Sequence, residues 1–223
     1  EVSAASSKTF FVSGAGGSIG AEITRQLLAG NPKQIILYEL SEYSLFQIER
    51  ECTVIIDSKD LDTSIVPILG DIRDQKNLNY IFKKFQVDHI YHAAAYKHVP
   101  IVEDENNLSI AAENNILGTY NLAKAAVENS IQSFVMISTD KAVRPTNIMG
   151  ATKRFAEIII QSINASTDNT RFCMVRFGNV INSSGSVIPL FLDQISRGGP
   201  VTVTDKDVMR YFMTIPEASS LVL

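Results

Sequence analysis

The sequence is poor in the features that identify secreted, metal-binding and nucleic-acid-binding proteins. Its 223 residues include two cysteines, Cys52 and Cys173, and no tryptophan. Because the cysteines form neither a CxxC motif nor a disulfide-like pattern, we expect a reducing, cytoplasmic environment in which both thiols pack as small apolar groups. The 20 basic and 24 acidic residues are interspersed and give a net charge of -4. Without a basic stripe, neither nucleic acid nor an anionic membrane is an expected partner.

Long apolar runs are also absent. No segment is apolar over the roughly 20 residues that span a bilayer, and the start, EVSAASSKTF, lacks the basic and apolar regions of a signal peptide. We therefore expect no membrane contact within this chain. The end, RYFMTIPEASSLVL, resembles the first turns of an apolar helix without a cap, which favours a fragment of a larger protein.

What the sequence does contain is a regular alternation of apolar, β-rich runs and helical patterns. The expected strands are TFFVSG, QIILYE, IVPILGD, HIYHAAA, SFVMIST and RFCMVRFGNV. Helices are expected over 18–30, 41–51, 74–85, 106–129 and 149–164. Strands that are apolar on both faces and separated by helices indicate a doubly wound, Rossmann-like α/β domain with a parallel sheet. Such sheets bind ligands beyond the carboxyl ends of their strands.

The first strand ends in GAGGSIG, where Gly14, Gly17 and Gly20 form a GxxGxxG spacing. Between a strand and a helix, such glycines permit a tight turn and the close approach of a pyrophosphate to backbone N–H groups. Ser18 and Ile19 then begin the helix. The alternative is a structural turn of small residues. The agreement of strand, turn and helix favours a dinucleotide site.

Carboxylates follow the next two strands. Glu39 ends the second strand, nineteen residues after Gly20. There it would accept hydrogen bonds from the adenosine ribose and repel a 2′-phosphate, which favours NAD over NADP. After the third strand, the Asp71 carboxylate would accept a hydrogen bond from the adenine amino group, and Ile72 would pack against the adenine ring. An equally good reading makes Asp71 the N-cap of the following helix.

The fourth strand ends in three small residues, Ala93, Ala94 and Ala95. Such small side chains would let a dinucleotide lie against the backbone. They would also allow a helix to pack tightly on the sheet, and the two interpretations are compatible. His89 and His92 are three residues apart on a strand, so their side chains should point to opposite faces. We therefore expect no metal site, and His92 is expected in the core.

The stretch NIMGATK contains an unusual pair. If it opens a helix, Met149 and Lys153 lie four residues apart on one face, as a tyrosine and a lysine do in many nicotinamide enzymes. Methionine has no ionisable proton. Any acid–base role of a tyrosine must therefore pass to another group or be absent.

These motifs together resemble a known family. GAGGSIG, GDIRD, HAAAYKHVP, NNILGT, STDKAVRPTNIMGATKR, RFGNVINSSGSVIPLF and RYFMTIPEA are similar to the extended short-chain dehydrogenase/reductases that act as polysaccharide-biosynthesis UDP-N-acetylglucosamine 4,6-dehydratases. The resemblance implies tightly held NAD, a UDP-sugar substrate and a homo-oligomer. It implies an NAD-binding domain at 8–180 and the beginning of a nucleotide-sugar-binding region at 181–223. Members often carry this domain, in the cytoplasm, behind a membrane anchor.

The resemblance also implies catalytic roles. Asp140 matches the acid that protonates the departing C6 oxygen, and Lys141 matches the base that removes the C5 proton. A lysine is a base only when neutral, and burial beside Lys153 and an oxidised nicotinamide would favour that form. The alternative for Lys141 is a solvated cation paired with Asp140 or with a surface acid. Because Met149 has no phenol, deprotonation of the C4 hydroxyl must pass through Thr139, Asp140 or a water linked to Lys153, and we rank Asp140, bridged by Thr139, first.

Other matched positions carry less specific signals. The resemblance places Lys97 and His98 near the cofactor and sugar phosphates, and Asn115 behind the strand ends. It places Asn179 and the SSGSVIP loop, with Ser186 and Val187, at the nucleotide sugar, and Arg210 at the diphosphate. Each of these could instead be structural, since Asn and Ser often stabilise turns and Arg is often solvated.

Two other functions fit part of the pattern. A UDP-sugar C4 epimerase needs only to remove a hydride from C4 and return it there. It has no use for an acid at C6 and a base at C5, which STDK would supply. A non-catalytic NAD- or UDP-sugar-binding regulator would be consistent with Met149.

Overall fold

Six parallel strands form the centre of the structure. The computed structural model describes residues 6–181, 183, 187–203 and 205–223. Hydrogen bonding orders the strands β3-β2-β1-β4-β5-β6, and neighbouring strands are parallel. Their bounds are β1 Thr9–Ser13, β2 Gln34–Glu39, β3 Ser64–Leu69, β4 His89–His92, β5 Ser133–Thr139 and β6 Arg171–Phe177. The order reverses between β1 and β4, so the predicted doubly wound α/β fold is confirmed.

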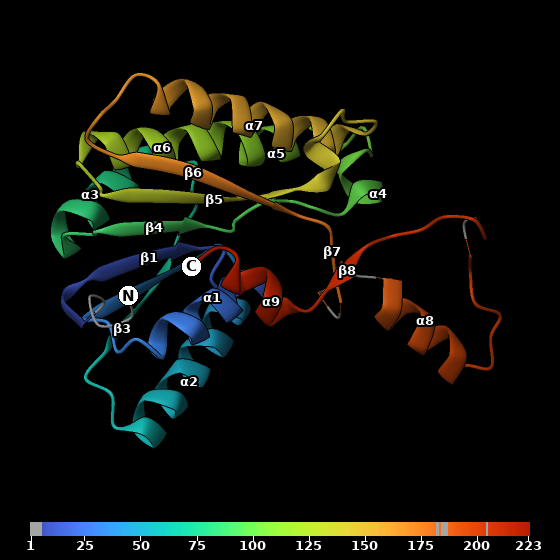
Figure 1. Cartoon of the computed structure of the whole chain (residues 1–223), viewed down its shortest axis with the longest axis horizontal. Coiled ribbons are helices and arrows are strands. Elements are labelled where there is room, and N and C mark those ends of the chain that lie inside the picture. The colour runs from blue at the N-terminus through green and yellow to red at the C-terminus, as the bar shows by residue number, and fades with distance from the viewer. Residues whose placement is uncertain (1–5, 182, 184–186, 204) are drawn as a thin grey trace.

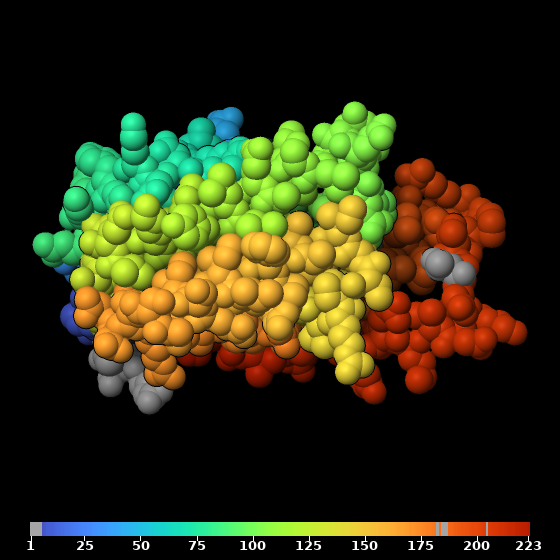
Figure 2. Space-filling view, turned by 90° about the horizontal axis from the view of Figure 1, so that it is seen from above, coloured from blue at the N-terminus to red at the C-terminus, as the bar shows by residue number. Residues whose placement is uncertain are grey.

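Helices cover both faces of this sheet (Figure 1). One face carries α1 (Ser18–Leu28) and α2 (Glu42–Lys59), and the other carries α3 (Gln75–Phe85), α6 (Thr119–Glu128) and α7 (Ile148–Asn164). Successive side chains of β1 enter opposite cores because a strand alternates its faces. Phe11 packs under α3, α6 and α7, whereas Phe10 and Val12 pack under α1 and α2. Seen from above, α3, α6 and α7 form a closed layer (Figure 2).

Side-chain caps begin three of these helices. Ser41, Asp74 and Asn147 each accept a hydrogen bond from a backbone N–H three residues later. Asp74 therefore caps α3, and the alternative that made Asp71 this cap is wrong. Asn147 starts α7 so that Met149 and Lys153 fall on its first two turns, as the spacing predicted.

The long helix expected over 106–129 is divided into three parts. α5 (Leu108–Ala112) and α6 flank a π-helical segment, η2 (Glu113–Gly118). A short helix, α4 (Val99–Val102), precedes them. The π segment turns Asn115 inward, where its amide contacts the loop after β4. Periodicity alone did not reveal this break, because the apolar spacing is continuous through it.

The strand expected over 171–180 is also divided. β6 ends at Phe177, and β7 (Asn179–Val180) pairs with β8 (Phe212–Met213) in a separate two-stranded sheet. A Cβ atom at Gly178 would lie 3.2 Å from the carbonyl oxygen of Tyr211. The glycine thus allows a distant segment to approach and end the main sheet.

The two cysteines differ in burial. Cys52 lies on α2, which continues to Lys59 instead of ending at Glu51 as predicted, and its side chain is fully buried. Cys173 is exposed, so the prediction of a buried thiol is wrong there. It lies on the edge strand β6, where the neighbouring side chain of Phe172 points into the core under α7 and Cys173 points to the other face.

The chain after β7 leaves the body of the fold and then returns. α8 (Val187–Ser196) has no buried residue and projects from one end (Figures 1 and 2). α9 (Ile215–Ser220), begun by a capping box of Thr214 and Glu217, packs against α1. Val222 then enters the core under α1 and α2. No helix in the described ranges is long and apolar enough to cross a membrane.

Candidate active site

Glycines shape the turn between β1 and α1. Gly14 has a φ of 67°, in the left-handed region. A Cβ at Gly20 would collide with the carbonyl oxygen of Gly14, and one at Gly16, which the motif did not single out, would lie 2.5 Å from Ser44 Cβ. Among the described residues, a Cβ at Gly17 would contact only the Gly14 oxygen, at 3.3 Å. The N-terminus of α1 is therefore open beside Gly17, as a pyrophosphate requires.

A cavity of about 290 Å³ lies beside this turn. It brings together eight of the residues predicted to bind the cofactor: Gly14, Gly17, Glu39, Asp71, Ile72, Ala93, Ala94 and Ala95. They come from the ends of four strands and meet at the point where the strand order reverses. This cavity is called the glycine-turn cavity below.

Glu39 is held by backbone groups at the edge of the glycine-turn cavity. Its Oε2 accepts a hydrogen bond from Gly16 N–H at 3.0 Å, and its Oε1 accepts from the N–H groups of Leu40 and Ser41 at 3.0 and 3.1 Å. The carboxylate therefore also fixes the glycine turn. This structural part of its position was not predicted from the sequence.

Asp71 is bound by a neighbouring arginine. Arg73 donates from Nε and Nη2 to Asp71 Oδ2 at 2.9 and 2.6 Å. These hydrogen bonds hold the pKa of Asp71 below its ordinary value. The carboxylate thus stays ionised at the cavity wall, next to the buried Ile72.

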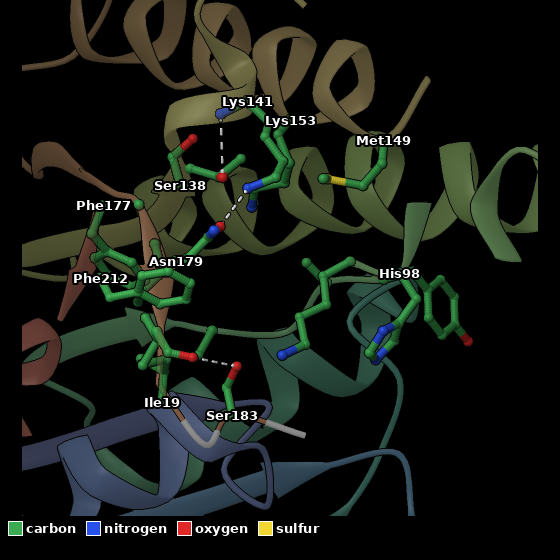
Figure 3. Close-up of a pocket in the computed structure, with 18 of the residues that line it drawn as sticks. Ile19, His98, Ser138, Lys141, Met149, Lys153, Phe177, Asn179, Ser183 and Phe212 are labelled. Atoms are coloured by element: carbon green, nitrogen blue, oxygen red, sulfur yellow. Dashed lines mark hydrogen bonds between the residues drawn. The ribbon is translucent and has the colours of Figure 1, made fainter. Parts of the chain in front are cut away.

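A second cavity, of about 360 Å³, lies beyond the ends of β4 and β5 (Figure 3). The predicted residues that line it are Ile19, Lys97, His98, Thr139, Lys141, Met149, Lys153, Asn179 and Val187. Ala93, Ala95 and Tyr96 line both cavities. The two cavities therefore form one trough along the carboxyl edge of the sheet.

Thr139, Asp140 and Lys141 form a connected group at the end of β5. Thr139 Oγ1 donates to Asp140 Oδ1 at 2.9 Å, and Lys141 Nζ donates to the same oxygen at 3.1 Å. Lys141 Nζ also donates to Asn179 Oδ1 at 3.1 Å. Although burial alone would raise it, the hydrogen bonds from Thr139 and Lys141 hold the pKa of Asp140 below its ordinary value. The ion pair that the sequence left open for Lys141 is present in this structure.

Lys153 and Met149 project from the same face of α7 into the second cavity (Figure 3). Lys153 is 6% exposed, and this burial lowers its pKa to about 8, against the opposing effect of Glu157. Met149 is buried and packs against Val102 and Ala111. The methionine thus fills space beside the ammonium group and offers it no proton.

Lys97 and His98 add two further titratable side chains to the second cavity. Burial lowers the pKa of Lys97. Burial lowers the pKa of His98 as well, and the charge of Lys97 adds to that effect. Burial therefore disfavours the charged forms of both side chains, and an anionic ligand in the cavity would favour them.

Five of the predicted residues that the structure describes line neither cavity: Ser18, Gly20, Asn115, Asp140 and Arg210. Ser18 and Gly20 lie in the first turn of α1, and Asp140 is hydrogen-bonded to Thr139 and Lys141, which do line the second cavity. The Asn115 amide is engaged by the backbone of Tyr96 and by Thr152, so Asn115 supports the loop after β4 from behind. Arg210 is exposed, and its Nη1 donates to the carbonyl of Met209. Ser186 lies outside the described residues.

His92 is a core residue, as predicted. Thr119 Oγ1 donates to the Asn115 carbonyl, so it accepts from His92 Nε2–H at 2.9 Å, and His92 Nδ1 accepts from Ser13 Oγ at 2.8 Å. Burial lowers the pKa of His92 to about 3, so the ring is neutral. His89 stacks on Phe10 instead, on the opposite face of the sheet.

Sequence reasoning missed a buried carboxylate behind the second cavity. Glu157 is fully buried and accepts hydrogen bonds from Ser138, Arg154 and Arg176. Its position four residues after Lys153, on the apolar face of α7, was the available signal. A lone glutamate on a buried helical face requires partners.

Comparison with known proteins identifies the family of this chain. Residues 10–223 match the family described as "Polysaccharide biosynthesis protein". The chain belongs to this family. It is 51% identical over 216 residues to the Capsular polysaccharide biosynthesis protein CapD of Staphylococcus aureus, covering 97% of this chain and 35% of CapD. The X-ray structure of Pen from Bacillus thuringiensis superimposes with a TM-score of 0.87 at 36% identity, covering 98% of this chain and 64% of Pen.

Two relatives carry names that state different activities. One is UDP-N-acetylglucosamine 4,6-dehydratase (inverting) of Campylobacter jejuni, 34% identical, and the other is UDP-glucose 4-epimerase of Rickettsia canadensis, 32% identical. Each match covers 97% of this chain and 62% of the relative. The chain thus spans about a third of CapD and under two thirds of the other two. The chain is therefore similar to proteins named as nucleotide-sugar dehydratases and epimerases.

Proposed function

We propose that this chain carries the NAD-binding and catalytic residues of a 4,6-dehydratase acting on a UDP-N-acetylhexosamine, with UDP-N-acetylglucosamine as the first candidate. The observation that carries the proposal is the second cavity. There Thr139, Lys141 and Lys153 meet, with Asp140 bonded to the first two. A dehydratase requires an acid for the C6 oxygen and a base for the C5 proton, and an epimerase requires neither of these two groups.

The glycine-turn cavity fits NAD. The open N-terminus of α1 beside Gly17 suits the pyrophosphate, and Glu39 suits an unphosphorylated ribose. NAD would supply the acceptor and donor of the hydride that leaves C4 of the sugar and returns at C6. Lys153, at the far end of the same trough, would bind the nicotinamide ribose hydroxyls.

Proton transfer at C4 would use Thr139 in place of a tyrosine. The Thr139 hydroxyl already donates to Asp140 Oδ1, so it can accept the C4 hydroxyl proton as it passes its own proton to the carboxylate. Asp140 then becomes the acid that protonates the departing C6 oxygen. Met149, which has no ionisable proton, takes no part.

Protonation of Asp140 would also prepare Lys141 as a base. Once Asp140 is neutral, Lys141 loses its counter-ion while the charge of Lys153 remains, which favours the neutral amine. Lys141 is partly exposed and can release its ammonium proton to water. It then takes the C5 proton as Asp140 protonates the C6 oxygen, and later returns a proton to C5. Uptake of one proton from water restores the ion pair.

The test is turnover of UDP-N-acetylglucosamine in deuterated water by the complete protein, followed by NMR. We expect a 4-keto-6-deoxy sugar with deuterium at C5. A C4-inverted sugar without deuterium would contradict dehydration and establish an epimerase, the second candidate that the relative from Rickettsia canadensis favours. Binding of NAD and UDP-sugar without turnover would indicate a regulator.

A further inference from the structure

A buried acid–base cluster ties α7 to the strands that end at the second cavity. Glu157 Oε1 accepts from Ser138 Oγ at 2.6 Å and from Arg176 Nε at 2.7 Å. Its Oε2 accepts from Arg176 Nη2 at 2.5 Å and from Arg154 Nη1 at 3.0 Å. The carboxylate is 0% exposed, and burial of a charge without such partners would be strongly unfavourable.

The cluster lies directly behind cavity residues. Ser138 of β5 and Arg176 of β6 are neighbours in the parallel register, and the next pair is Thr139 with Phe177. Both members of that next pair line the second cavity. Because Lys153 leaves α7 one turn before Glu157, a displacement of the carboxylate would move the ammonium group relative to Thr139.

We propose that Glu157 is a positioning residue that fixes Lys153 at the second cavity and keeps its ammonium group charged there. This inference rests on the proposed function, in which cationic Lys153 binds the nicotinamide ribose. Mechanical support of α7 alone would not need a carboxylate, since well-packed apolar side chains often replace buried ion pairs without loss of stability. What the carboxylate adds is negative charge.

The charges around Lys153 show why that negative charge matters. Burial favours the neutral amine, and Glu157 opposes this effect. Glu157 itself stays ionised, because its hydrogen bonds from Arg176, Ser138 and Arg154 lower its pKa to about 2 although burial alone would raise it. His92, which interacts with Lys153 from β4, is neutral. Other charged or titratable groups on the surrounding elements are Arg154 of α7, Arg176 of β6, the Asp140–Lys141 pair after β5, and Lys97 and His98 after β4.

Removal of the Glu157 charge would leave three neighbouring cations. Arginine does not lose its proton under ordinary conditions, so Lys153 is the cation that would become neutral. Removal of one arginine would have the opposite effect and would favour the charged form of Lys153. Arg154 is suitable for this purpose because its side chain is 40% exposed and Arg176 keeps Glu157 bound.

The test compares the titration of Lys153 in two variants of the complete protein. Glu157→Gln removes negative charge with little change of shape, and Arg154→Met removes positive charge. Trace acetylation with acetic anhydride between about pH 6 and 11, followed by mass spectrometry of the Lys153 peptide, gives the midpoint directly. We expect about 8 in the wild type. We expect a midpoint lower by roughly half a unit or more in Glu157→Gln, and a higher midpoint in Arg154→Met.

A matched control is Glu22→Gln. Glu22 forms an i,i+3 ion pair with Arg25 on α1, away from Lys153, and its loss should leave the Lys153 midpoint unchanged. A general loosening of the fold would shift the Lys153 midpoint in the same direction in both variants. Shifts in the same direction, or no shift in either variant, would therefore overturn the inference. If Glu157→Gln fails to unfold cooperatively in urea, Arg154→Met is compared with Arg154→Lys, which keeps the positive charge. A higher Lys153 midpoint in Arg154→Met than in Arg154→Lys supports the inference, and equal midpoints overturn it.

Activity separates this inference from the proposed function. In the wild type, lack of dehydration of UDP-N-acetylglucosamine would contradict the proposed function whatever the titration shows. If the wild type is active, the alkaline limb of its pH profile should move down in Glu157→Gln and up in Arg154→Met. If the wild type is active and the pH profiles of both variants are unshifted, the role of Glu157 is contradicted and the proposed function is not.

Discussion

Met149 places a thioether where a proton-transferring side chain could reach the second cavity. Its side chain is 3% exposed and contacts Val99, Val102 and Ala111. These contacts are apolar, and the helix that carries Met149 is fixed by the Asn147 cap. The physical role of this residue is therefore packing that keeps the first turn of α7, and with it Lys153, against the cavity.

Met149→Leu should retain activity. The two side chains have similar volume, so the free energy of unfolding should change by less than about 1.5 kcal/mol. Turnover of UDP-N-acetylglucosamine measures the effect. A hundredfold loss, about 2.7 kcal/mol of transition-state stabilisation, would show that the thioether itself matters. Met149→Ala is the packing control, with an expected destabilisation of about 2 to 5 kcal/mol.

Lys141→Met should separate the two chemical steps. C4 oxidation uses Thr139 and Asp140 and should continue, whereas C5 deprotonation should fall by about a hundred- to ten-thousandfold. In deuterated water the products should be a 4-keto sugar with little deuterium at C5 and little 6-deoxy sugar. The control is Lys124→Met, which removes an exposed lysine paired with Glu128 on α6. Near wild-type exchange at C5 in Lys141→Met would mean that another group is the base.

Among the elements, the β1–α1 turn shows how one motif serves two purposes. Gly14 and Gly20 are needed for the fold, because a side chain at Gly20 would strike the Gly14 carbonyl. Gly17 is different. A methyl group there would lie 3.3 Å from the Gly14 oxygen, so the backbone would have to shift by only a few tenths of an ångström, and it would occupy the space beside the α1 N-terminus.

Gly17→Ala should therefore weaken NAD binding while the fold persists. We expect a change in unfolding free energy of about 1 kcal/mol or less and at least a tenfold loss of NAD affinity by calorimetry, about 1.4 kcal/mol. Gly20→Ala is the matched comparison and should lose several kcal/mol of stability, because the Gly14 backbone must move. Unchanged NAD affinity in Gly17→Ala would place the pyrophosphate elsewhere.

The sequence predicts the elements well where local pattern determines them. The strand at 133–139 is found with the predicted bounds, because its apolar run is bounded by polar residues. The strand at 171–180 is broken because the segment ending at Tyr211 approaches Gly178. That segment is far away in the sequence, so no local pattern reveals the contact. The π segment η2 escapes prediction for a similar reason, since Asn115 finds its partners in a loop and in α7.

In the whole molecule, tertiary contacts decide which polar groups are buried and charged. The motifs predicted that strand ends would meet, and the two cavities contain most of the residues expected there. They did not predict that Glu157 would meet Ser138 and Arg176, each nineteen residues away in sequence. They also did not predict that α9 would return to α1. Assembly into a homo-oligomer and a cytoplasmic location stay predictions.

Buried titratable groups should make the molecule sensitive to acid. The pKa of His92 is about 3 in the folded chain and 6.5 ordinarily, so below pH 6.5 the unfolded chain binds a proton that the folded chain does not. Stability therefore falls as the pH drops from about 6.5 toward 3. For Glu157, the folded pKa is about 2 and the ordinary value 4.5, so its contribution is present above pH 4.5 and is lost as the pH falls toward 2.

Urea unfolding at a series of pH values should show these two windows. Each group should contribute a slope of about 1.4 kcal/mol per pH unit within its window. His92→Gln retains a donor toward Thr119 and cannot titrate, so its stability should be lower at neutral pH but flatter between about pH 6.5 and 4.5. Glu157→Gln should keep the wild-type slope in that range and be flatter only below about pH 4.5. Equal slopes for His92→Gln and wild type between about pH 6.5 and 4.5 would mean that His92 takes up its proton in the folded core.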